Sequence, residues 1–133
     1  WRYIDKPNNK YKILLYVKNK LTKGYLIYSI KQNHGTKIGY IMDIIADPKD
    51  KHVINELIKH AKKKLYNEKV ALTSALSFDG NIFYSNYKDN SFFKLPQKFL
   101  PHKSYFSIYN FMELNNNISL EDWNISWGVH DNI

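Results

Sequence analysis

Asp43 is the side chain whose position most clearly suggests chemistry, because it interrupts an apolar run between Gly39 and Ala46. A buried carboxylate is costly unless it is paired. Asp43 therefore either lines a cleft that solvent reaches or bonds to a neighbour, and the sequence leaves both alternatives open. A carboxylate is a usual type of general base for deprotonating an amine. Asp43 is thus a candidate catalytic residue.

Other common catalytic chemistries find little support. The chain has no cysteine, which excludes disulfides, cysteine-ligated zinc and cysteine nucleophiles. None of its five histidines has a partner four residues away or a nearby carboxylate pattern of ligand type, so no metal site is expected. Thr73, Ser74 and Ser77 lack the sequence setting of a hydrolase nucleophile.

The elements that would position Asp43 form a strand–helix–strand unit. Its first strand ends at Asp47-Pro48, where Asp47 is expected to cap the helix and Pro48 to take its first position. The helix is predicted to extend to Tyr66, and the second strand spans 70–76. This length suits a crossover between two parallel strands. The apolar stripe of the helix is Val53, Ile54, Leu57, Ile58, Ala61 and Leu65.

Strands at 11–17, 24–30 and 37–46 are joined by short turns and predict an antiparallel meander before the helix. After the crossover we expect a short helix from Asp79 to about Asp89, then strands at 105–114 and 123–127. The predicted fold is a single α/β (α+β) domain over 1–133, with a mixed, mostly antiparallel sheet and a β-α-β crossover.

The chain has a formal net charge of +8, from 20 Lys+Arg against 12 Asp+Glu, which favours anionic partners or a solvated lysine-rich surface. Arg2 is the only arginine, which argues mildly against a nucleic-acid reader. No apolar stretch approaches the roughly 20 residues of a membrane-spanning helix. The absence of cysteine fits a cytoplasmic protein. The opening at Trp1, without an initiator Met, suggests a piece of a longer protein.

This order of elements resembles the GNAT superfamily of N-acyltransferases, without the N-terminal strand and helices of the complete fold. The likeness spans nearly the whole chain. Within the superfamily, the chain looks most like a group associated with polysaccharide or amino-sugar metabolism. The stretches that carry it are Trp1-Arg2-Tyr3 with Pro7, Gly24-Tyr25-Leu26-Ile27-Tyr28, the run from Gly39 to Pro48, and Trp123-Asn124-Ile125-Ser126-Trp127-Gly128 with Asp131.

The resemblance implies a binding site for acetyl-CoA as co-substrate. In such enzymes the pantetheine arm pairs with a splayed strand edge, which here corresponds to Ile44, Ile45, Ala46 and Asp47. The pyrophosphate lies on the amides at the start of the following helix, because aligned N–H groups and the positive helix end bind anions. The corresponding residues are Lys49, Lys51, His52 and Val53, with Lys49, Lys51 and His52 as counter-charges.

The sequence departs from the family pattern in this loop. Glycines usually let the backbone close on the phosphates, yet no glycine lies between Gly39 and Gly80. Asp47 and Asp50 also compete with a phosphate for the same amides. At the C-terminus, Val129 replaces the first Asp of the family's G-D-x-D pattern.

The resemblance also implies a tyrosine acid that protonates the departing thiolate. Tyr84 and Tyr87 both lie in the predicted short helix, and Tyr84 is preferred because it is closer to the end of the preceding strand. A packing role for either remains an alternative in a chain with 11 tyrosines.

The function that the resemblance implies is acetyl transfer from acetyl-CoA to a small-molecule amine, with an amino sugar or polysaccharide precursor as the expected acceptor. The missing N-terminal part of the same protein would complete the acceptor site. One alternative is a GNAT-fold module that no longer binds CoA and serves a structural or partner-binding role. Others are an aminoacyl-tRNA-dependent transferase and a basic nucleic-acid-binding module.

Overall fold

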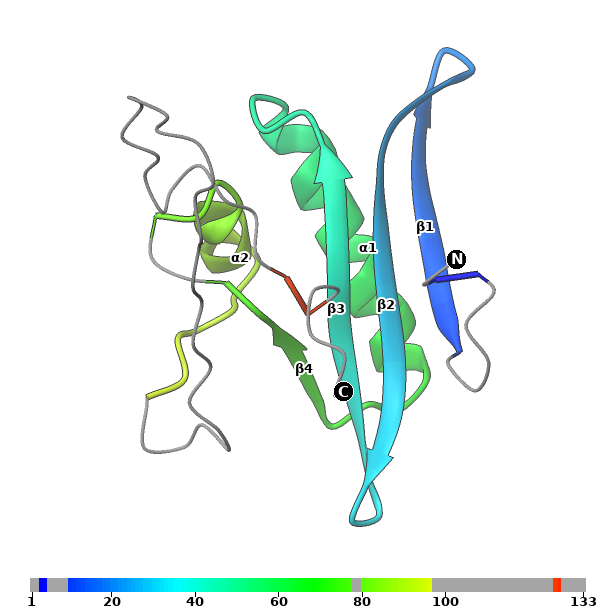
Figure 1. The fold of residues 1–133 in the computed structure, drawn as a ribbon, viewed down its shortest axis with the longest axis vertical. Helices are drawn as coiled ribbons and strands as arrows, with labels where there is room; N and C mark the ends of the chain where they lie inside the picture. Colours follow the sequence, from blue (N-terminus) through cyan, green and yellow to red (C-terminus); the bar gives the residue numbers. More distant parts are fainter. Residues whose placement is uncertain (1–2, 5–9, 78–79, 97–125, 128–133) are drawn as a thin grey trace, which may run out of the picture.

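The computed structural model describes residues 3–4, 10–77, 80–96 and 126–127. Within these residues the chain forms one sheet of four strands and two helices (Figure 1). The elements are β1 (Tyr11–Lys18), β2 (Leu21–Asn33), β3 (Thr36–Ala46), α1 (Lys51–Asn67), β4 (Leu72–Ala75) and α2 (Tyr84–Asp89). No helix in the described ranges is long and apolar enough to cross a membrane.

The sheet has the strand order β1-β2-β3-β4, and β2 runs antiparallel to both of its neighbours, β1 and β3. Asn19 and Lys20 connect the first hairpin with φ angles of 52° and 61°, and His34 and Gly35 connect the second with 46° and 81°. Two-residue turns with positive φ at both positions match the twist of the flanking strands. The predicted meander is confirmed.

β3 and β4 run parallel and are joined by α1, so the predicted crossover is also confirmed. Their pairing begins at Ile38 with Leu72 and ends at Ile41 with Ala75. On the other side of β3, the register with β2 shifts by one residue at Met42. Such a bulge bends its strand and increases the local twist. Beyond it, β4 diverges from β3 (Figure 1).

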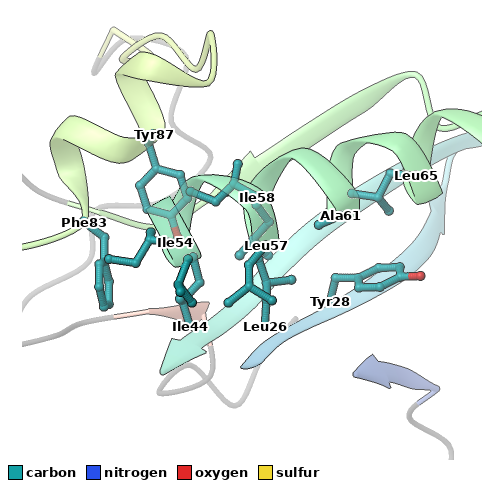
Figure 2. Packing of buried hydrophobic residues seen from close by; sticks show 12 residues of the cluster. Leu26, Tyr28, Ile44, Ile54, Leu57, Ile58, Ala61, Leu65, Phe83 and Tyr87 are labelled. Carbon is teal, nitrogen blue, oxygen red and sulfur yellow. The ribbon is translucent and has the colours of Figure 1, made fainter. Parts of the chain in front are cut away.

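α1 covers one face of the sheet and packs against β1, β2 and β3. All six residues of the predicted apolar stripe are buried, as expected. They meet Leu26 and Tyr28 of β2 and Ile41 and Ile44 of β3, and Phe83 and Tyr87 of the α2 region join the same cluster (Figure 2).

The predicted helix start is wrong by three residues. Asp50, not Asp47, is the N-cap: its Oδ1 accepts the Val53 amide at 3.1 Å, and α1 begins at Lys51. Asp47 instead starts a turn in which its carbonyl accepts the Asp50 amide at 2.9 Å. Asp followed by Pro favours the first two positions of a β-turn, and this turn takes Pro48 out of the helix.

The predicted short helix also begins later than expected. Asn81 Oδ1 accepts the Phe83 amide and its carbonyl accepts the Tyr84 amide, each at 2.9 Å. This local turn holds residues 81–83 outside the helix, and α2 begins at Tyr84.

Several predictions lie wholly or partly outside the described residues. They concern Trp1-Arg2, Pro7, Asp79, the strand at 105–114, the terminus from 128 with Asp131, and most of the strand at 123–127. Ser126 and Trp127 are described and do not belong to a strand.

Candidate functional site

The last five residues of β3 form a strand edge that β4 does not pair with. Residues 42–46 lie beyond the last β3–β4 pair, while Ile44, Ile45 and Ala46 remain paired with β2 on their other side. The side chain of Ile44 is buried toward α1, whereas Ile45 is 50% exposed. Among the described strands, β4 therefore supplies no partner for the backbone groups on this side of the segment.

The N-terminus of α1 follows this edge directly. The first amides of a helix have no partner within the helix. Here the Asp50 side chain occupies the Val53 amide, and Asp47 Oδ1 accepts the Lys49 amide at 2.9 Å. The helix itself supplies no partner for the amides of Lys51 and His52. Two of the amides predicted to bind pyrophosphate are thus satisfied internally, and two remain at the helix end.

The basic side chains predicted for this site surround the helix start. Lys49, Lys51 and His52 are exposed. The His52 ring lies edge-on to Tyr16 of β1, with 6.1 Å between ring centroids. One turn along α1, the Glu56 carboxyl has its pKa lowered mainly by the hydrogen bond from Lys59 and less by His52. An anion at the helix end would meet positive charge on this side.

Asp43 is half-buried and hydrogen-bonded, as in the alternative in which it bonds to its neighbours. Oδ1 accepts the Ile44 amide at 2.9 Å and the Ser126 hydroxyl at 3.4 Å, and Oδ2 accepts the Tyr3 hydroxyl at 3.3 Å. Tyr3 and Ser126 lie near the two ends of the described part of the chain. A role for Asp43 as general base is not tested by these contacts and stays a prediction.

Trp127, like its neighbour Ser126, contacts a side chain of β3. Its ring lies edge-on to Tyr40, with 6.0 Å between centroids. Tyr40 alternates along β3 with Gly39 and Ile41, which face α1, so Trp127 and Ser126 lie on the opposite face of the sheet. No pattern in the sequence indicated the contacts of Tyr3 and Ser126 with Asp43.

Tyr87 extends from α2 into the core, and its ring points toward Ile54 of α1 (Figure 2). It is 8% exposed and lies edge-on to Phe92, with 5.3 Å between ring centroids. Burial raises the pKa of the Tyr87 phenol far above its ordinary value, and the charge of Asp43 raises it further. The charge of Asp43 thus acts on Tyr87, and both effects favour the protonated form of the Tyr87 phenol.

Tyr84 lies at the first position of α2 and is half-buried. In the described part of the chain, no interaction joins it to Asp43. The sequence-based preference for Tyr84 over Tyr87 rested on distance along the chain. The packing of α2 on α1 makes Tyr87 the tyrosine that is buried in the core.

The described residues hold no group of three or more metal-ligating side chains. They do hold a cluster of asparagines that the sequence analysis missed. Asn86 and Asn90 both donate to Oδ1 of Asn55, at 2.9 and 3.0 Å. The four-residue spacing of Asn86 and Asn90 was the available signal, because it puts both on one face of a helix.

The arrangement of these strands and helices is similar to that of several solved structures. A probable acetyltransferase matches 75% of this chain and 70% of its own, with 17% identity and a TM-score of 0.59. The chain has the fold of the GNAT acetyltransferases. The aminoglycoside N-acetyltransferase AAC(6')-Iy, solved in complex with CoA, covers 74% of this chain and 75% of its own, at 12% identity and a TM-score of 0.56.

A second aminoglycoside enzyme of this GNAT fold is the 6'-N-acetyltransferase AAC(6')-IG from Acinetobacter haemolyticus. It covers 75% of this chain and 71% of its own, with 19% identity and a TM-score of 0.54. No protein-family profile and no curated protein matches the chain by sequence. At these identities the likeness concerns the GNAT fold.

Proposed function

We propose that this chain is a CoA-dependent N-acetyltransferase, in which acetyl-CoA is the co-substrate and a small-molecule amine is the acceptor. The amine nitrogen bonds to the thioester carbonyl carbon, the carbon–sulfur bond breaks, and the departing thiolate takes up a proton. Aminoglycoside acetyltransferases are among the solved structures of the same fold, which supports an amino sugar or a related polysaccharide precursor as the acceptor class.

The observation that carries this proposal is the end of the β3–β4 pairing at Ile41, which in the described part of the chain leaves residues 42–46 beyond β4 and directly before the N-terminus of α1. An extended pantetheine arm can pair with the backbone of such an edge, as a peptide adds a strand to a sheet. Its pyrophosphate would then reach the amides of Lys51 and His52 and the positive end of the helix.

We assign the proton donor to Tyr87 and keep Tyr84 as the second candidate. A tyrosine hydroxyl is protonated in the neutral range, so that of Tyr87 can donate a hydrogen bond to negative charge that develops on sulfur. Backbone amides at Ile45–Asp47 are the candidates for polarising the thioester carbonyl, and Asp43 is the candidate base.

The proposal is tested by calorimetric titration of the full chain with acetyl-CoA at moderate salt, with ATP as an anion control. A parallel assay follows release of the free thiol in the presence of glucosamine. We expect acetyl-CoA to bind more tightly than ATP and the thiol to appear only when the amine is present. Equal binding of the two ligands, together with no thiol release, would reject the enzyme assignment.

The second candidate is a GNAT-fold module that does not use CoA, either a partner-binding domain or an aminoacyl-tRNA-dependent transferase. Its support is the internal use of the Val53 and Lys49 amides by Asp50 and Asp47. Each carboxylate adds negative charge where a pyrophosphate would lie. The titration distinguishes the two candidates, because only the first requires selective acetyl-CoA binding.

A further inference from the structure

We propose that Asn55 of α1 is a positioning residue that sets the direction of the Tyr87 side chain by holding α2 through two buried asparagines. This inference rests on the proposed function insofar as Tyr87 is the proton donor. Asn55 Oδ1 accepts hydrogen bonds from Asn86 Nδ2 at 2.9 Å and from Asn90 Nδ2 at 3.0 Å. One acceptor therefore binds both ends of the segment that contains Tyr87.

The asparagine cluster has one further hydrogen bond between Asn86 and Asn90 and another to α1. Asn90 Nδ2 also donates to the Asn86 carbonyl at 2.8 Å, and Lys62 Nζ donates to the Asn90 carbonyl. Asn86 is 1% exposed and Asn90 is 5% exposed. Buried amides in a satisfied network hold one geometry, because any displacement leaves a donor without its partner.

α2 needs such support because it has only six residues and its N-cap residue Phe83 makes no side-chain hydrogen bond to the helix. Isolated helices of this length are not stable in water. Apolar packing of Tyr87 against Ile54 and Ile58 attaches α2 to α1 but tolerates small rotations. The directional bonds to Asn55, the neighbour of Ile54, remove that freedom.

Adjacent residues in α1 and α2 thus make the apolar and the polar contacts between the two helices. Ile54 and Tyr87 make the apolar contact, and Asn55 and Asn86, one residue away in each helix, make the polar contact. A rotation of α2 that broke the Asn86 bond would also turn the Tyr87 hydroxyl away from its present direction, since the two residues are adjacent. The position of the proposed proton donor is therefore coupled to a side chain on the other helix.

The test compares three variants of the full chain. Asn55→Ala removes the acceptor, Asn55→Asp keeps an acceptor oxygen at the same place, and Leu65→Val weakens the core at the far end of α1. We expect Asn55→Ala to lower kcat about 10-fold or more with little change in KM for acetyl-CoA. Asn55→Asp should recover most of kcat, and Leu65→Val should lower Tm while leaving kcat unchanged at a temperature where it is folded.

A second readout does not depend on catalysis. Tyrosine labelled with ¹³C at Cζ reports the ionisation of each phenol by NMR, and Tyr87→Phe assigns the Tyr87 signal. In the wild type this signal should not titrate near the ordinary pKa of about 10, whereas in Asn55→Ala it should move toward that value. An unchanged Tyr87 titration in Asn55→Ala would overturn the inference. If the wild type transfers no acetyl group, the proposed function fails, and this NMR comparison still decides the role of Asn55.

Discussion

Gly39 of β3 and Leu65 of α1 are so close that a Cβ atom on Gly39 would lie 2.7 Å from Cδ2 of Leu65. Real Cβ atoms do not approach a neighbour to this distance. The last turn of α1 therefore rests directly on the backbone of β3. This contact sets the distance between the C-terminal end of α1 and β3.

Gly39→Ala should therefore destabilise the fold by about 1–3 kcal/mol, the usual cost of overpacking a core. Urea unfolding of the variant and the wild type measures the difference. The double variant Gly39→Ala/Leu65→Val should lose less than the sum of the two single losses, because the smaller side chain gives the new methyl group room. Additive losses would contradict the contact as the cause.

Tyr87→Phe should lower kcat about 10²-fold or more, because it removes the proposed donor and keeps the ring that fills the core. Tyr84→Phe is the matched control, since it removes a hydroxyl from the same helix and should change kcat little. Steady-state kinetics with acetyl-CoA and glucosamine measure both. A larger loss in Tyr84→Phe would return the donor role to the residue that the sequence favoured.

The stability of the protein should fall as the pH rises above about 10, in part because of Tyr87. The pKa of its phenol is raised in the folded state, chiefly by burial, so the unfolded chain releases this proton first. The stabilisation is complete below the ordinary pKa and is lost at higher pH. Unfolding free energies at about pH 9 and about pH 11 should differ more in the wild type than in Tyr87→Phe.

The pKa of Tyr28 is also raised by burial, and this residue is unchanged in both proteins. Its contribution therefore cancels in the comparison. The same pH dependence in the wild type and in Tyr87→Phe would show that Tyr87 ionises normally in the folded chain.

Asp50→Asn should strengthen acetyl-CoA binding about two- to fivefold, the effect of one charge at a helix terminus. Asparagine caps a helix about as well as aspartate, so α1 should keep its start and its stability. Calorimetry measures the affinity, and Asp89→Asn, at the exposed end of α2, controls for net charge. Weaker binding by Asp50→Asn would mean that the ligand does not approach this end of α1.

Local patterns in the sequence were enough to predict the meander, the crossover and the buried stripe of α1. Hairpin turns depend on neighbouring residues, and the helical period of Val53 to Leu65 needs only one apolar surface to pack against. The fold class followed from these elements in order. The prediction of Asp47 as the cap was wrong, because the turn that begins at Asp47 leads to Asp50, which caps α1.

The candidate site depended on contacts that no local pattern contains. Tyr3 and Ser126 reach Asp43 from 40 and 83 residues away, and Asn55 meets Asn86 across 31 residues. Tyr84 and Tyr87 are equivalent as residue types in a short helix. Only the docking of α2 on α1 buried one of them, Tyr87, in the core, because burial is a property of the packed molecule.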